Sequence, residues 1–187
     1  TNHGDFVLWL NDRHTSFGDF FFQYWTYLGD GVLLAIVALY FLFTNLHKFY
    51  YMLIAIALQT VFVHIFKQWL FDGEPRPKTF FADQLDSLNF VEGVNTRGFD
   101  SFPSGHTASA FTLAFVLISI CKNKTLNVLI FISAVLVGIS RVYILQHFLR
   151  DIYIGSVFGI LAALIAWYIM KPYADRPKLQ NGLLKKK

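Results

Sequence analysis

The stretch SRVYILQHFLRD, residues 140–151, lies at the junction of two long apolar runs, residues 126–143 and 148–170. Charged side chains at such a junction are costly in a membrane unless they have partners or a function. His147 and Asp151 are four residues apart, so in a helix they share one face and the carboxylate can accept a hydrogen bond from the imidazole. That bond fixes the tautomer and raises the basicity of the other ring nitrogen. The stretch therefore predicts two helices that meet at an oriented imidazole.

Arg141 adds an anion-binding guanidinium to the same stretch. A trio of Arg, His and Asp at a helix end is often purely structural, so these three residues alone do not identify an active site. The rest of the chain decides between the structural and the chemical interpretation.

The composition is that of an integral membrane protein. Of the 187 residues, 55% are hydrophobic and only 15% are charged, and the mean hydropathy is +0.47. A soluble domain of this length needs far less apolar surface. The single cysteine, Cys121, excludes an intramolecular disulfide. The net charge of +4 does not indicate nucleic-acid binding, because the basic residues are sorted by membrane side and form no single patch.

We expect an all-α, polytopic transmembrane helix bundle of about five spans, forming one membrane-embedded domain over residues 1–187. Residues 1–28 are aromatic but too polar to cross in one run, so they predict interfacial helices. The apolar run 32–43 reaches spanning length only if its helix begins in that aromatic segment. A span before Thr1 is compatible with this pattern. The other four expected spans are residues 49–71, 104–121, 126–143 and 148–170.

Two polar segments lie outside the expected spans. Residues 72–103 predict a long extramembrane loop, and residues 171–187 predict a basic tail. Loops of this length are usually functional. The apolar residues of the 72–103 loop either dip into the lipid as a lip over the site or serve as ordinary interfacial anchors. These residues are Phe80, Phe81, Leu85, Leu88 and Phe90.

Charge counting predicts the orientation. One side of the expected bundle holds nine basic residues against one acid, Asp175; the nine are Lys48, Lys122, Lys124, Lys171, Arg176, Lys178 and Lys185 to Lys187. The other side holds the remaining seven basic residues and eleven acids. Lys-rich short connectors belong in the cytoplasm. The long loop and the charged stretch therefore face outward.

Three clusters are expected to meet on that outer face: Lys67 with Arg76, residues 103–106 (Pro-Ser-Gly-His), and residues 140–151. Pro, Ser and Gly suit a helix start, where free N–H groups and the helix dipole bind anions. Together with the cations, this describes a pocket for a tetrahedral dianion. His64 shares a helical face with Lys67, which we expect to point into the bundle as a hydrogen-bonded residue or a proton relay.

One further pattern concerns packing. Gly155 and Gly159 form a GxxxG pair on the last expected span, which predicts close helix packing.

These motifs, in this order, resemble the three-part signature of the type 2 phosphatidic acid phosphatase superfamily. The second motif, residues 103–106, and the third, Arg141 to Asp151, match in full. The first departs, because eight residues separate Lys67 from Arg76 where the family usually has six. Two extra helical residues rotate a side chain by about 200°. Either residues 71–73 form a bulge that absorbs them, or Lys67 is not a phosphate ligand.

The resemblance implies a set of roles. His147 is the nucleophile that forms a phosphohistidine, Asp151 orients it, and His106 is the general acid and base. The implied phosphate-binding groups are Lys67, Arg76, Ser104, Gly105 and Arg141. No metal or other cofactor is implied. His106, His147 and Asp151 as three metal ligands form the alternative, which the surrounding cations disfavour.

The resemblance also implies a substrate and a place. The expected partner is a phosphorylated membrane lipid in the bilayer, with undecaprenyl diphosphate, phosphatidylglycerol phosphate, phosphatidic acid and lipid A as candidates. The expected location is a bacterial inner membrane, with the site facing the periplasm. A lipid phosphoryltransferase with the same intermediate and a non-catalytic phospholipid-binding protein remain alternatives. The sequence leaves the oligomeric state open.

Overall fold

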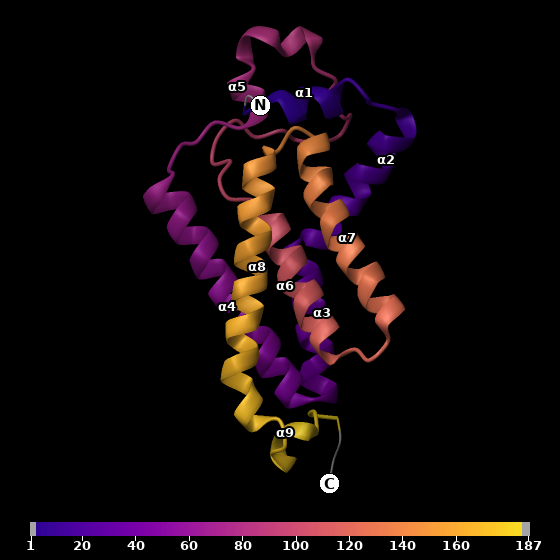
Figure 1. Ribbon diagram of the computed structural model, residues 1–187, viewed down its shortest axis with the longest axis vertical. Coiled ribbons are helices and arrows are strands. Elements are labelled where there is room, and N and C mark those ends of the chain that lie inside the picture. The colour runs from indigo at the N-terminus through magenta and orange to yellow at the C-terminus, as the bar shows by residue number, and fades with distance from the viewer. Residues whose placement is uncertain (1–2, 185–187) are drawn as a thin grey trace.

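The structure is a computed structural model that describes residues 3–184, and it is an elongated bundle of helices (Figure 1). The α-helices are α1 (Asp5–Asn11), α2 (Ser16–Trp25), α3 (Gly31–Thr44), α4 (Leu46–Ile65), α5 (Pro77–Phe80), α6 (Gly105–Ile120), α7 (Lys124–Tyr143), α8 (Leu149–Met170) and α9 (Pro177–Gln180). Shorter helical turns are η1 (Thr26–Gly29), η2 (Phe66–Leu70), η3 (Ala82–Ser87) and η4 (Lys171–Tyr173). The all-α prediction is confirmed.

Short polar side chains set the starts of the main helices. Each accepts a hydrogen bond from a backbone N–H in the first turn, which would otherwise be unpaired. The capping residues are Thr15 for α2, Asp30 for α3, Asn45 for α4, Ser104 for α6 and Asn123 for α7.

Three helices are long and apolar enough to cross a membrane: α4 continued through η2, α7, and α8 continued through η4. A fourth crossing results if α2–η1 and α3, which are bent by 47° relative to each other, form one broken span. The predicted third span corresponds to α6, which has 16 residues. That length falls short of the roughly 20 residues that a hydrocarbon core needs. By length and composition, the described residues therefore provide three or four candidate spans, and the predicted count of five is not confirmed.

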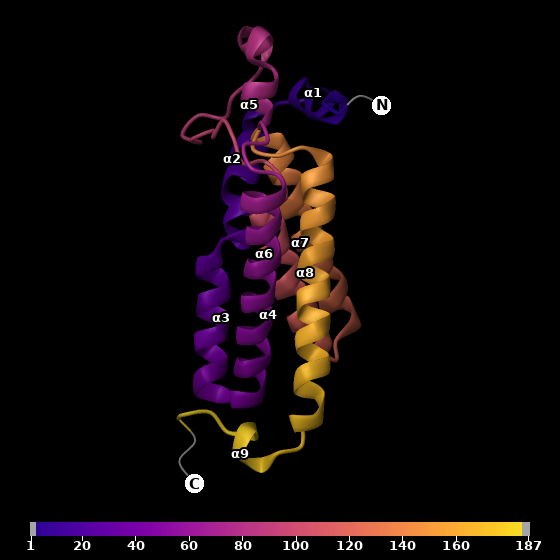
Figure 2. The ribbon, with the colours of Figure 1, turned by 90° about the vertical axis from the view of Figure 1, so that its left-hand side faces the viewer.

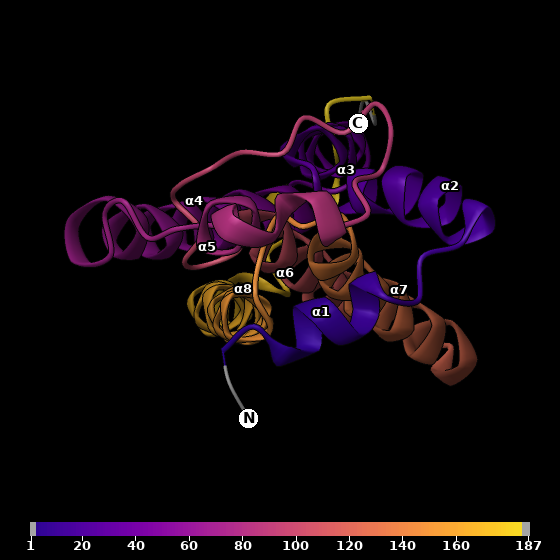
Figure 3. The ribbon, with the colours of Figure 1, turned by 90° about the horizontal axis from the view of Figure 1, so that it is seen from above.

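The two expected N-terminal helices are present but pack differently, and their interfacial location remains a prediction. Helix α1 lies across the end of the bundle, over α7 and α8 (Figure 3). Helix α2 and η1 instead lead into α3 and pack against α7. Their aromatic side chains find partners on the bundle: the Trp25 indole, for example, donates to the Ser133 carbonyl oxygen at 3.2 Å.

Helix α6 is the centre of the bundle and packs against α4, α7 and α8. The close approach to α8 depends on Gly155 and Gly159, as the GxxxG pattern predicts. A methyl group at Gly155 would collide with the Ser104 carbonyl oxygen, and one at Gly159 with the carbonyl oxygen of Ala108. This packing brings the start of α6 to the start of α8, where the Ser104 N–H donates to the Asp151 carbonyl oxygen at 3.0 Å.

The long loop folds over one end of the bundle through α5 and η3 (Figure 2). Phe81 and Leu88 are only 8% exposed and form a core cluster with Val7 of α1 and with Val142 and Phe148. Neither of the two roles considered, a lip in the lipid or an interfacial anchor, fits Phe81 and Leu88, because both pack in a core cluster with α1. Phe80 and Phe90 remain exposed.

The basic tail lies at the opposite end of the bundle, around η4 and α9 (Figure 2). It folds back on the α3–α4 junction, where the Leu183 N–H donates to the Leu42 carbonyl oxygen at 3.1 Å. Lys185 to Lys187, which entered the charge count, lie outside the described residues.

Candidate active site

A cavity of about 430 Å³ lies at the end of the bundle that α1 and the long loop cover. It brings together six of the eight residues that the sequence singled out, from η2, the loop, α6, α7 and the turn after α7: Lys67, Arg76, Gly105, His106, Arg141 and His147. The other two, Ser104 and Asp151, are fully buried and do not line it. The convergence of the three motifs is therefore observed.

His147 and Asp151 form a buried pair at the wall of the cavity. Nδ1 of His147 lies 3.4 Å from Oδ2 of Asp151. The same oxygen accepts hydrogen bonds from the Ser101 hydroxyl at 2.5 Å and the Phe148 N–H at 2.9 Å. One carboxylate oxygen, Oδ2, thus contacts all three groups, whereas buried Oδ1 has no hydrogen-bond partner among the described residues. With Nδ1 occupied, Nε2 is the ring nitrogen left for a ligand.

Burial decides the charge of His147. The ring is 2% exposed, and loss of hydration lowers its pKa well below the usual value of 6.5. The hydrogen bond with Asp151 raises the pKa, and the charges of Arg76 and Arg141 lower it, but burial has the largest effect. The imidazole is therefore neutral at pH 7, as a nucleophile must be.

Arg76 is clamped by backbone and side-chain oxygens. Its Nε donates to Phe99 O at 2.7 Å, Nη2 to Asp100 O at 3.0 Å, and Nη1 to both Gln146 O and Gln146 Oε1, at 3.0 and 2.8 Å. A guanidinium has five N–H groups, so these four bonds leave one for a ligand. Asp100 adopts a left-handed conformation, with φ 59°, at this contact.

Arg141 has an unused donor. It is 7% exposed, and its Nη1 donates to the Thr26 hydroxyl at 2.9 Å. Its buried Nε finds no hydrogen-bond acceptor among the described residues. An unpaired buried N–H is costly, and an oxygen of a bound anion would satisfy it.

The spacing irregularity of Lys67 has a structural explanation. Residues Phe66–Leu70 form a π-helical turn, which takes up more residues per turn than an α-helix, and Gly73 then reverses the chain in a left-handed conformation, with φ +72°. Lys67 consequently lines the cavity, and its Nζ donates to Asp100 O at 2.7 Å. The irregular backbone that absorbs the two extra residues therefore begins at Phe66, earlier than the predicted bulge at residues 71–73.

The irregular turn also explains a wrong expectation. His64 is exposed on α4 and does not point into the bundle with Lys67. The π-helical turn that begins at Phe66 changes the angular spacing of the side chains that follow.

Ser104 caps α6. Its hydroxyl oxygen accepts hydrogen bonds from the Thr107 N–H at 3.4 Å and from the Thr107 hydroxyl at 2.9 Å. A phosphate-binding role for the Ser104 hydroxyl remains a prediction. Gly105, the next residue, does line the cavity, at the positive end of the α6 dipole.

Sequence reasoning missed several lining residues. Arg97 reaches the cavity from the loop, and Gln23, Thr26 and Tyr27 reach it from α2 and η1. None belongs to a motif, so no local signal distinguishes them. With Arg97, the described residues that line the cavity include four cationic side chains and no Asp or Glu. Within residues 3–184, no three His, Cys, Asp or Glu side chains are grouped so as to hold a metal ion.

Comparison with known proteins gives consistent matches. A model of the PAP2 superfamily matches residues 48–174. The lipid A 4'-phosphatase of Bacteroides thetaiotaomicron is 28% identical over 169 residues, which cover 87% of this chain and 74% of that protein.

Two crystal structures share the fold. LpxE of Aquifex aeolicus matches with a TM-score of 0.75 and 30% identity, over 88% of this chain and 93% of that one. A PAP2-type phosphatidylglycerolphosphate phosphatase from Bacillus subtilis matches with a TM-score of 0.66 and 22% identity, over 91% and 85% of the two chains. At that identity the second likeness is one of fold.

Proposed function

The chain belongs to the PAP2 superfamily and is a membrane-embedded phosphatase of that type, and we propose that it hydrolyses a phosphate or diphosphate group of a membrane lipid through a phosphohistidine. One observation carries the proposal: a neutral, buried imidazole held by Asp151 lies at a cavity that four cationic side chains line. Binding an anion requires the cations, but it does not require an oriented nucleophile.

In the first step, the Nε2 lone pair of His147 attacks phosphorus and the P–O bond to the lipid breaks. His106, which lines the same cavity, enters this step as an imidazolium and donates its extra proton to the departing oxygen, which leaves the ring neutral. Asp151 stabilises the positive charge that develops on the His147 ring. The products of this step are the lipid alcohol, or the lipid monophosphate from a diphosphate, and phosphohistidine.

In the second step, water attacks the phosphohistidine. Neutral His106 accepts a proton from the water, the P–N bond breaks, and inorganic phosphate leaves with His147 restored. If a second lipid hydroxyl replaced water, the protein would be a phosphoryltransferase. The two outcomes share every residue of the site.

The cations stabilise the equatorial oxygens of the phosphoryl group. Arg141 Nε and the remaining N–H of Arg76 have no acceptor among the described residues, and the Gly105 N–H lies in the first turn of α6. Lys67 adds a positive charge. Preorganised donors of this kind supply the electrostatic stabilisation that phosphoryl transfer needs, and the scheme has no step that requires a metal.

The substrate that we favour is a phosphate group of lipid A or a similar glycolipid, because the relative named lipid A 4'-phosphatase aligns over most of both chains. We place the cavity on the periplasmic side of a bacterial inner membrane. The described basic residues of the tail, Lys171, Arg176 and Lys178, and the basic connectors support this, because these segments lie at the end opposite the cavity (Figure 1).

The test is phosphate release in detergent micelles containing excess EDTA, with lipid A, undecaprenyl diphosphate, phosphatidylglycerol phosphate and phosphatidic acid as substrates. We expect release that is lost in His147→Ala and kept in His64→Ala, whose side chain is exposed outside the cavity. The relative rates identify the lipid. Release that EDTA abolishes contradicts the metal-free scheme, and label transfer to an added lipid alcohol without phosphate release identifies a transferase.

A further inference from the structure

A second hollow shares three elements, η1, α6 and α7, with the active-site cavity. It has a volume of about 170 Å³, and of its lining residues only Ser133 is polar. The lining residues are Leu28, Leu33, Ala110, Leu113, Ala114, Leu117, Ile130, Ser133, Ala134 and Val137. Apolar cavities of about 150 Å³ hold a molecule the size of benzene, so this hollow suits one stretch of hydrocarbon chain.

The hollow continues the active-site cavity along three elements. On α6, Ala110 follows the cavity residue His106 after one turn. On α7, Val137 lies one turn before the cavity residue Arg141. On η1, Leu28 follows Tyr27 directly. The polar active-site cavity is therefore followed along the bundle by the apolar hollow, as the polar head of a lipid is followed by its hydrocarbon chain.

The bend between η1 and α3 shapes the hollow. Above the bend, α2 and η1 pack against α7, and Trp25 is tied to Ser133. Below it, α3 packs against α4 and α6. Small side chains on α6 and α7, Ala114 and Ala134 among them, then leave space between the diverging helices. The floor of this space is α6.

We propose that the hollow between α3, α6 and α7 binds the first stretch of a hydrocarbon chain of the lipid substrate while its phosphate lies at His147. This inference rests on the proposed function and adds to it. It assigns the recognition of the chain to residues of which two, Leu28 and Leu33, precede the region matched by the family model.

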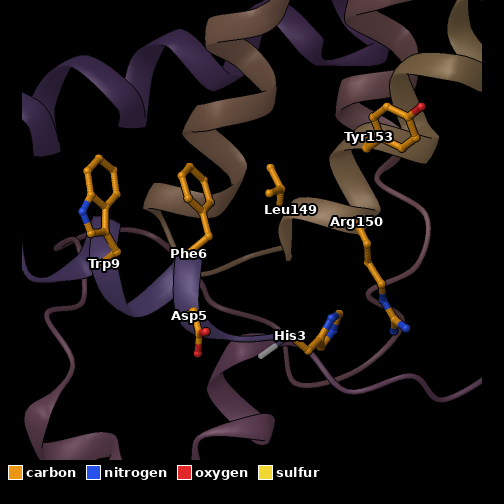
Figure 4. Close-up of a pocket in the computed structure, with 7 residues that line it drawn as sticks. All are labelled: His3, Asp5, Phe6, Trp9, Leu149, Arg150 and Tyr153. Carbon is orange, nitrogen blue, oxygen red and sulfur yellow. The ribbon is translucent and has the colours of Figure 1, made fainter. Parts of the chain in front are cut away.

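A larger groove is the competing site. It has a volume of about 810 Å³ and lies between α1 and the start of α8, lined by apolar Phe6, Trp9, Leu149 and Tyr153 and by His3, Asp5 and Arg150 (Figure 4). It lies on the Asp151 side of the nucleophile, since Arg150 Nε contacts Asp151 Oδ1 at 3.4 Å. His147 turns Nδ1 toward Asp151, so its reactive Nε2 faces the other way.

The first test compares long-chain with short-chain phosphatidic acid, both at the same mole fraction in detergent micelles. Ala114→Leu and Ser133→Leu fill the hollow, and we expect each to lower the long-chain to short-chain ratio of kcat/KM about tenfold, the loss of roughly two buried methylene groups. Ile132→Phe adds volume on the exposed face of α7, next to Ser133, and should leave the ratio unchanged. An unchanged ratio in both filling variants overturns the proposal.

The second test locates the chain without relying on turnover. His147→Ala protein is irradiated with a phosphatidic acid that carries a diazirine near the head of one chain, and the labelled peptides are mapped. Labels on α6 and α7 between Ala110 and Val137 support the proposal, whereas labels on Phe6, Trp9 or Tyr153 overturn it. If wild-type protein releases no phosphate but α6 and α7 are labelled, the proposed function fails and the chain-binding site stands.

Discussion

The Ser101 hydroxyl donates a 2.5 Å hydrogen bond to Oδ2 of Asp151, the oxygen that also lies 3.4 Å from His147 Nδ1. Ser101 and Asp151 are both fully buried. Ser101 belongs to the loop, two residues before the second motif, and Asp151 belongs to α8, so the loop reaches across to hold the carboxylate of the third motif. The orientation of the nucleophile therefore depends on the loop.

The first prediction concerns this bond. Ser101→Ala should lower kcat about tenfold with KM little changed, because a hydrogen bond to a charged group contributes roughly 1.5–3 kcal/mol and only part of that acts on the transition state. Steady-state phosphate release measures both constants. Ser87→Ala is the control, since that hydroxyl bonds only within its own turn, to Gln84 O. A rise in KM with constant kcat would show that Ser101 acts in binding instead.

The second prediction concerns Arg141. Its buried Nε has no acceptor within residues 3–184, which makes Arg141 the strongest candidate for a transition-state donor. Arg141→Lys keeps the positive charge but loses the planar set of guanidinium N–H donors. It should lower kcat/KM by about two orders of magnitude, as loss of an oxyanion donor does. Arg13→Lys is the matched control, because Arg13 lies outside the cavity and stacks on Trp9. Equal activities of the two variants would exclude this role.

The third prediction concerns pH. Because burial lowers the pKa of His147, the ring should take up its proton only below pH 6.5. NMR of protein with labelled histidines, with His147→Ala to assign the signal, should show a midpoint below 6.5. This titration avoids the substrate, whose own phosphate titrates near pH 6. A midpoint at or above 6.5 would mean that the Asp151 interaction outweighs burial.

The fourth prediction concerns packing. Gly155→Ala places a methyl group against the Ser104 carbonyl oxygen, and should lower the free energy of unfolding by about 1–3 kcal/mol and separate the starts of α6 and α8. Thermal unfolding in detergent, together with activity, measures this. Gly31→Ala is the matched control, because a methyl group there meets no atom within 4 Å. If Gly31→Ala were as destabilising as Gly155→Ala, the close-packing explanation would be wrong.

Motif order and spacing predicted which side chains meet. Arg76, His106, Arg141 and His147 come from four segments, and all line the one cavity. Helix ends at a common membrane depth bring such residues together whatever the details of packing. Ser101, Arg97 and Thr26 were missed, because each reaches the site through a loop path or a bend that has no periodic signal.

The sequence by itself determined the apolar helices, the cationic motifs and the close approach at Gly155, since hydropathy, charge and side-chain size act locally. Only the tertiary structure decided that α2 joins the bundle, that Phe81 is covered by α1, and that the π-helical turn carries Lys67 into the cavity. Those outcomes depend on contacts between segments far apart in the chain. Local preference leaves several such arrangements open, and packing selects one of them.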